Sequence, residues 1–253
     1  MQAEINNIFD NIEIVLVETT HPGNIGAAAR AMKAMGLKHL RLVNPRTFPG
    51  AEATARAAGA DDILESAACH GSLREAIADC SLVYGTSNRN RNIPWPLMDA
   101  ETSAQAVIRA VGEGVRAAIL FGTESSGLSN DDLELCHGLI RIPVNGEFPS
   151  LNIAAAVQVI CYELRKTILK GKPDGEPVNA GSPPVNSEQM VQLYEHMQEC
   201  LRDLEFYNPE RPRLLMRRLK RIFNRLYLDE NEYNIIRGIL AAAQEAAKKK
   251  YNA

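Results

Sequence analysis

The chain has 253 residues, of which 45% are hydrophobic and 23% charged, and a formal net charge of −3. These values are ordinary for a globular protein with one large domain, or with one domain and an appendage. Five cysteines, never spaced as Cys-x-x-Cys, argue against a disulfide framework and a cysteine zinc site. The start of the chain lacks the pattern of a secretory signal, and no apolar run is long enough for a membrane span, so we expect a cytoplasmic protein that needs neither metal nor membrane.

Apolar segments alternate with helical patterns along residues 1–170. The predicted strands are 12–18, 39–44, 81–87, 117–122 and 139–144. The predicted helices are 24–35, 72–80, 99–111, 129–137 and 150–169, the fourth starting at a capping box of Ser129 and Asp132. Largely apolar strands that lack an alternating pattern and that alternate with helices indicate an α/β fold, with a mostly parallel sheet and helices on both faces.

Four loops are predicted to lie together at one edge of this sheet. Parallel strands end at the same edge, and ligands of such sheets bind outside the carboxyl ends of the strands. The loops that follow the predicted strands at this edge are 19–26, 85–95, 121–128 and 144–152. We therefore expect the functional site there.

The composition changes after residue 170. Residues 171–186 are rich in Pro, Gly and Asn and indicate a flexible linker. Residues 187–253 have a helical pattern throughout, and within them 211–225 hold seven Arg or Lys and no acidic residue. On a helix, one face would carry Arg213, Arg217, Arg221 and Arg225, and another Leu215, Leu219, Ile222 and Leu226.

This basic face has two interpretations. It can bind the phosphates of a nucleic acid, which supply most of the affinity of such complexes. It can also be a solvated face, paired with the acidic residues that follow at Asp229, Glu230 and Glu232.

The first strand-to-helix turn, around Gly23 and Gly26, invites comparison with a dinucleotide fingerprint. The third glycine of that fingerprint is missing, and the second strand ends in Val43-Asn44-Pro45 without a carboxylate for a ribose, so a nicotinamide or flavin enzyme is disfavoured. What remains is a helix N-terminus, suited to an anion, with Asn24 and Arg30 nearby. The alternative is that Asn24 only caps the helix and Arg30 is a solvated surface residue.

The turn around Gly23 and Gly26 belongs to the first of three motifs that follow one another along the chain, each at a strand-to-helix junction. They are Asn24…Gly26…Arg30, then Phe121-Gly122-x-Glu124-x-x-Gly127-Leu128, then Ile142-Pro143…Ser150-Leu151-Asn152. Residues 12 to about 170 thereby resemble the SPOUT superfamily of S-adenosylmethionine-dependent RNA methyltransferases. The segment "GTSNRNRNIPWP" at 85–96 and the helical C-terminal region are similar to the bacterial branch of that family that methylates the ribose of cytidine or uridine at position 32 of the tRNA anticodon loop.

The resemblance implies a C-terminal trefoil knot, a homodimer with the site near the subunit interface, and tRNA, not DNA, as the partner. The cofactor S-adenosylmethionine would be held by Thr86, Ser87, Gly122, Glu124, Ile142, Ser150, Leu151 and Asn152. The tRNA would be bound by Arg89 and Arg91 and by Arg213, Arg217, Arg221 and Arg225.

Methyl transfer to a ribose hydroxyl needs alignment of the partners and loss of one proton. We expect Arg30 to stay charged, to bind the phosphate next to the target ribose and to stabilise the developing alkoxide. Ser150 would position the hydroxyl, and Asn24 would orient Arg30 or the ribose. The five histidines, expected at the surface or at helix caps rather than as bases, are His21, His39, His70, His137 and His196.

Each motif residue also has a purely structural explanation. Ser150 and Asn152 can cap the following helix, Glu124 can bind N–H groups of its own loop, and Gly122 and Gly127 can serve a positive φ. Two other functions keep the same fold: a methyltransferase that acts on ribosomal RNA or on a base nitrogen, and a non-catalytic knotted protein that binds RNA.

Overall fold

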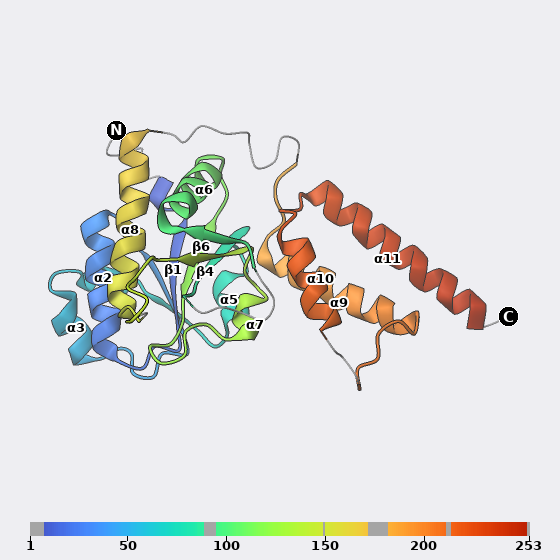
Figure 1. Ribbon diagram of the computed structural model, residues 1–253, viewed down its shortest axis with the longest axis horizontal. Coiled ribbons are helices and arrows are strands. Elements are labelled where there is room, and N and C mark those ends of the chain that lie inside the picture. Colours follow the sequence, from blue (N-terminus) through green and yellow to red (C-terminus); the bar gives the residue numbers. More distant parts are fainter. Residues whose placement is uncertain (1–7, 89–94, 149, 172–181, 211–213, 252–253) are drawn as a thin grey trace.

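Seven parallel strands form one sheet in the order β3-β2-β1-β6-β4-β7-β5. The computed structural model describes residues 8–88, 95–148, 150–171, 182–210 and 214–251 (Figure 1). The strands are β1 (Ile12–Val17), β2 (His39–Val43), β3 (Ala68–His70), β4 (Leu82–Thr86), β5 (Leu97–Asp99), β6 (Ala117–Phe121) and β7 (Gly138–Arg141). The neighbours β1, β6, β4 and β7 are the strands that precede the four loops expected to meet, which confirms the predicted gathering of those loops at one edge.

Helices cover both faces of the sheet, as predicted. One face packs against α2 (Pro22–Met35), α6 (Ala100–Gly112) and α8 (Ile153–Lys170). The other packs against α5 (Leu73–Ile77) and α7 (Asn130–Leu133). Because successive strand residues point to opposite faces, Ile14 and Leu16 belong to the first core and Val15 and Val17 to the second. Two short helices, α3 (Ala51–Ala57) and α4 (Asp61–Glu65), pack outside α2.

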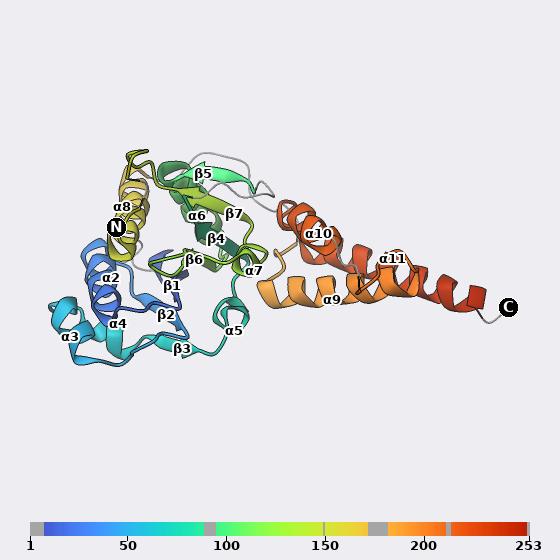
Figure 2. The same cartoon turned by 60° about the horizontal axis from the view of Figure 1, so that its bottom comes forward.

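The last three helices lie at one end of the sheet (Figures 1 and 2). They are α9 (Ser187–Asp203), α10 (Leu215–Asn224) and α11 (Glu230–Tyr251). They enclose a core of their own, to which Leu193, Tyr194 and Leu228 contribute. Helix α9 starts at a capping box of Asn186 and Gln189. None of the helices that the structure describes combines the length and the apolarity needed to cross a membrane.

Several predicted boundaries were wrong. The helix that starts at the Ser129 capping box ends at Leu133 and does not reach His137. Helix α2 begins at Pro22, two residues before the predicted start, because proline suits the first helical position. Four short elements, β3, β5, α3 and α4, were not predicted from the sequence.

Candidate functional site

A pocket of about 400 Å³ lies where the loops after β4, β6 and β7 meet. Its wall combines apolar side chains, such as Ile140 and Ile153, with hydroxyl groups and backbone. Seven of the eight predicted cofactor residues line it: Thr86, Ser87, Gly122, Glu124, Ile142, Ser150 and Leu151. Asn152 is not part of the lining. A pocket of this size and mixed character is typical of small-molecule sites.

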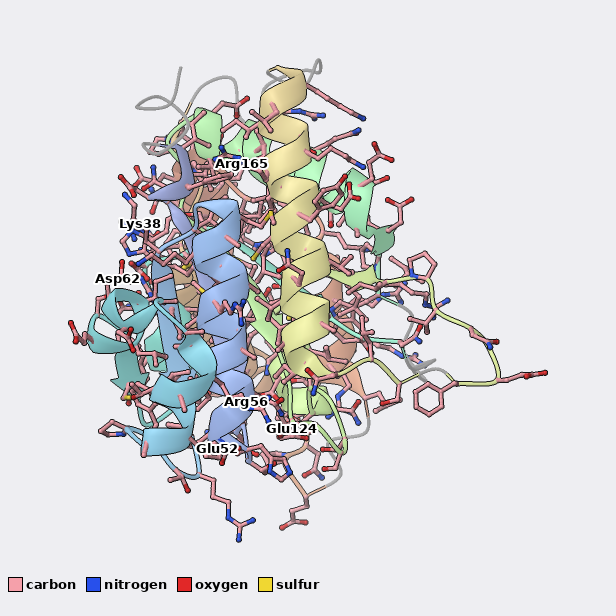
Figure 3. The ribbon with its side chains drawn as sticks, turned by 90° about the vertical axis from the view of Figure 1, so that its left-hand side faces the viewer. Lys38, Glu52, Arg56, Asp62, Glu124 and Arg165 are labelled. Carbon is pink, nitrogen blue, oxygen red and sulfur yellow. The ribbon has the colours of Figure 1, made fainter. Side chains whose placement is uncertain are left out.

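Glu124 ties the loop after β6 to the start of α2. Its carboxylate accepts hydrogen bonds from the backbone N–H of Thr20 at 3.0 Å, the Thr20 hydroxyl at 2.9 Å and the backbone N–H of His21 at 3.2 Å. The Asn24 Nδ2 donates a further bond at 2.9 Å. Figure 3 shows Glu124 near the ends of α2 and α8 at which these helices begin. Glu124 thus binds N–H groups of another loop besides its own backbone N–H, and Thr20 is a site residue that the sequence pattern did not indicate.

This network sets the charge of Glu124. Burial opposes ionisation, but hydrogen bonds from Asn24 and Thr20 outweigh it and lower the pKa of Glu124 to about 2. A carboxylate with so low a pKa is a poor base for a ribose hydroxyl. Its hydrogen bonds join the loop after β6 to the start of α2.

Asn24 links all three motifs. While its Nδ2 binds Glu124, its Oδ1 accepts a bond from Asn152 Nδ2 at 3.0 Å. Asn152 is also the N-cap of α8, because its Oδ1 accepts the backbone N–H of Ala154 at 2.9 Å. His21, not Asn24, occupies the N-cap position of α2. Asn24 is thus not the cap of α2, and each end of its amide makes one bond to a residue of another motif.

The glycines of the motifs are required by close backbone contacts or by a positive φ. A Cβ on Gly122 would lie 2.1 Å from the Leu128 backbone nitrogen, so only glycine lets this loop fold back on itself. Gly127 has a φ of +68°, in the left-handed region that favours glycine. A Cβ on Gly26 would lie 2.0 Å from the Ala53 carbonyl oxygen, which shows that Gly26 serves the close packing of α2 against α3.

Arg30 and Ser150 both face solvent. The side chain of Arg30 makes no hydrogen bond or ion pair with any described residue, so its charge is available to a ligand. Ser150 lines the pocket and does not cap α8, a position that Asn152 holds.

Some cations of α10 bind acidic side chains of the protein, and others are exposed to solvent. Arg217 binds the carboxylates of Glu134 and Asp131, and Lys220 binds Glu134 at 2.8 Å, so these cations join α10 to α7 and the turn after it. The alternative partners Asp229 and Glu232 instead bond to each other's backbone N–H. Arg218 and Arg225 are exposed, and Arg221 is half-buried. Arg89, Arg91 and Arg213 lie outside the described residues.

His137 corrects the expectation that the histidines lie at the surface or at helix caps. Its side chain is 6% exposed and stacks on Tyr227, with ring centroids 5.4 Å apart. Its Nδ1 accepts the backbone N–H of Val83 at 3.0 Å, and burial lowers the pKa of His137 to about 4. Within the described ranges, no three His, Cys, Asp or Glu side chains are grouped so that they could hold a metal ion.

Comparisons with known proteins agree with this geometry. Residues 11–162 match the model of the SpoU rRNA Methylase family, and residues 188–252 match that of the tRNA methyltransferase TrmJ, C-terminal domain. The chain is 44% identical, over 95% of its length and 96% of the relative, to the tRNA (cytidine/uridine/adenosine-2′-O-)-methyltransferase TrmJ of Pseudomonas aeruginosa. The crystal structure of TrmJ from Z. mobilis superposes with a TM-score of 0.79 at 35% identity, over 91% of this chain and 97% of that one. AviRb from Streptomyces viridochromogenes, solved in complex with AdoMet, shares the fold at 23% identity, over 63% of this chain and 61% of that one, with a TM-score of 0.50.

Proposed function

The chain belongs to the SpoU methylase family, and from that premise we propose that it transfers a methyl group from S-adenosylmethionine to a ribose 2′-hydroxyl of tRNA. The single observation that carries this proposal is the pocket of about 400 Å³ between the loops after β4, β6 and β7, with seven predicted cofactor residues in its lining. The relatives named above, which the chain matches over nearly its whole length, support tRNA as the substrate class. Position 32 of the anticodon loop stays a prediction from the resemblance.

The lining of the pocket fits the cofactor. Apolar walls such as Ile140 and Ile142 suit an adenine ring, and the hydroxyls of Thr86, Ser87 and Ser150 suit polar groups. When bound, S-adenosylmethionine supplies the methyl group and, as a sulfonium, its own leaving group. The network of Glu124, Asn24 and Asn152 keeps the loops at the fixed spacing that alignment of the reactants requires.

Arg30 is the residue that we propose to act on the ribose. Its guanidinium is exposed and is not paired with any described residue. It stays charged, so it can bind the phosphate beside the target ribose and stabilise the alkoxide as the hydroxyl loses its proton. Ser150 positions the hydroxyl. Asn24 acts indirectly, by holding the loops.

We propose that the chain works as a homodimer, joined through the exposed side of α8. Large apolar side chains there are accessible: Tyr162 is 53% and Leu169 60% exposed. Leu151, 39% exposed, lines the cofactor pocket near the start of the same helix. A second copy on this side would cover these side chains and lie beside the pocket. The trefoil knot and a cytoplasmic location stay predictions.

The test measures isotope transfer from labelled S-adenosylmethionine to bulk tRNA and then maps the modified nucleotide. We expect a 2′-O-methylated cytidine, uridine or adenosine in tRNA. Label on a base, or label in ribosomal RNA offered as acceptor in a parallel reaction, would favour a methyltransferase that acts on ribosomal RNA or on a base nitrogen. Cofactor binding without transfer would favour a non-catalytic protein that binds RNA. Arg30→Lys should lose turnover while it keeps the affinity for S-adenosylhomocysteine; near-normal turnover would remove Arg30 from the mechanism.

A further inference from the structure

One buried side chain of the C-terminal helices binds directly to the frame of the cofactor pocket. Asn224, at the end of α10, is 4% exposed. Its Nδ2 donates to two backbone carbonyls, of Glu134 and of Cys136, each at 3.0 Å. Its Oδ1 accepts a bond from the hydroxyl of Tyr194 in α9. The amide thereby clamps residues 134–137, which we call the α7–β7 junction.

The junction is packed rigidly against the strand that leads to the pocket. His137 and Val83 are joined twice, by the His137 N–H to the Val83 carbonyl at 2.8 Å and by the Val83 N–H to His137 Nδ1 at 3.0 Å. A Cβ on Gly85 would lie only 3.0 Å from Cys136 Sγ, so little space separates the junction from β4. A displacement of the junction therefore moves the carboxyl end of β4.

That end of β4 and the strand after the junction supply part of the pocket wall. β7 pairs with β4 up to Thr86 and Ile140, and the Ser87 N–H binds the Ile140 carbonyl at 3.0 Å. All three residues line the pocket. The path from Asn224 to the cofactor wall thus runs through hydrogen bonds and one strand pair.

We propose that Asn224 is a positioning residue for methyl transfer, which holds the wall of the cofactor pocket through the α7–β7 junction. This inference rests on the proposed function, because it assigns Asn224 a task in that reaction. It also ties the basic helix α10 to the cofactor pocket, since Arg217 and Lys220 of the same helix bind Glu134 at the start of the junction.

The chain offers its own reporter at this point. Trp95, the single tryptophan, donates its Nε1–H to the same Cys136 carbonyl at 3.2 Å. A change in the position of the junction should therefore change the emission of Trp95, whether or not the protein is active.

The experiment compares full-length Asn224→Leu with Tyr194→Phe as the matched control. Both variants remove the buried hydrogen bond between Tyr194 of α9 and Asn224 of α10, but only Asn224→Leu also removes the two bonds to the junction. For Asn224→Leu we expect roughly tenfold weaker binding of S-adenosylhomocysteine by calorimetry, equivalent to about 1.4 kcal/mol, because part of the cost of releasing the junction is transmitted to the pocket wall. We also expect a matching rise in the KM for S-adenosylmethionine and a shifted Trp95 emission. For Tyr194→Phe, we expect both values within twofold of the wild type and unchanged emission.

Wild-type affinity and emission in Asn224→Leu would overturn the inference, as would equal losses in the two variants. If Asn224→Leu does not fold, Asn224→Ser decides, because its hydroxyl cannot reach both carbonyls; wild-type affinity in that variant would overturn the inference as well. Failure of the wild type to methylate tRNA would instead count against the proposed function, and the emission of Trp95 would still report on the junction.

Discussion

Replacement of Asn24 by aspartate should turn the link between the motifs into a pH-dependent one. In the wild type, Asn24 Nδ2 lies 2.9 Å from an oxygen of Glu124. Two carboxylates about 3 Å apart at this half-buried site would repel each other by about 1 to 6 kcal/mol, for effective dielectric constants between roughly 80 and 20. The lost charge-assisted hydrogen bond adds about 1.5 kcal/mol. Such a pair avoids this cost by sharing one proton, so its folded-state pKa rises above that of the unfolded chain.

The sign of the effect follows from the two pKa directions. In the wild type, the pKa of Glu124 falls from 4.5 to about 2, so its stabilising contribution is present above pH 4.5 and is lost as the pH falls from there towards 2. In Asn24→Asp, the shared proton stabilises at low pH, and this contribution is lost as the pH rises through the raised pKa. The difference in unfolding free energy between the two proteins should therefore grow from pH 5 to pH 8.

Urea unfolding of the wild type, Asn24→Asp and Asn24→Ala between pH 5 and 8 measures this difference, and groups common to all three proteins cancel. Asn24→Ala should lose about 1 to 3 kcal/mol at every pH, because it removes hydrogen bonds without adding a charge. Binding of S-adenosylhomocysteine should follow the same order, with Asn24→Asp weakest at pH 8. A difference between wild type and Asn24→Asp that is constant over the range would refute the assignment of Asn24 as the partner of an ionised Glu124.

Two further predictions concern stability. The pKa of His137 falls from 6.5 to about 4 in the folded chain, so the unfolding free energy should decrease as the pH drops from 6.5 to 4, by at most about 3 kcal/mol at 1.36 kcal/mol per pKa unit. His137→Asn should flatten this part of the urea-unfolding profile. Parallel profiles of the wild type and the variant would contradict the prediction. Gly26→Ala should destabilise the protein by about 2 kcal/mol or more, because the added Cβ meets the Ala53 carbonyl. The matched helical variant Gly238→Ala has open space around the added Cβ and should stabilise the protein by about 0.5 to 1 kcal/mol. Thermal melting temperatures that shift in the same direction for both variants would contradict the close packing at Gly26.

The sequence predicted the central part of the fold because burial on both faces leaves a clear pattern. Strand β6 is apolar at every position, β1 is apolar at every position except Glu13, and both are buried throughout. The short edge strands β3 and β5 have exposed residues and only three positions each, too few for a period. Their pairing depends on neighbours far along the chain, which a local pattern does not contain.

The sequence also indicated which residues meet at the site, but not which hydrogen bonds join them. Glu124, Asn24 and Asn152 were predicted to lie together, and they do. The hydrogen bonds that tie Asn24 to both of the other motifs follow only from the distances. The burial of His137 was missed for a similar reason: its partners, Val83 and Tyr227, come from segments 54 and 90 residues away.

The helical pattern of α10 predicts which cations share a helix, but not which of them are available to RNA. Spacing correctly places Arg217 and Arg221 on one helix, but a cation binds whichever carboxylate the fold brings to it. Glu134 is 9% exposed and needs a compensating charge, which Arg217 and Lys220 provide. If phosphates are bound on α10, they therefore meet the exposed guanidinium groups of Arg218 and Arg225 first, while Arg217 keeps the helix attached to the methyltransferase fold. Loss of Arg225 should then weaken tRNA binding and lower its salt dependence, whereas loss of Arg217 should act on the docking of α10.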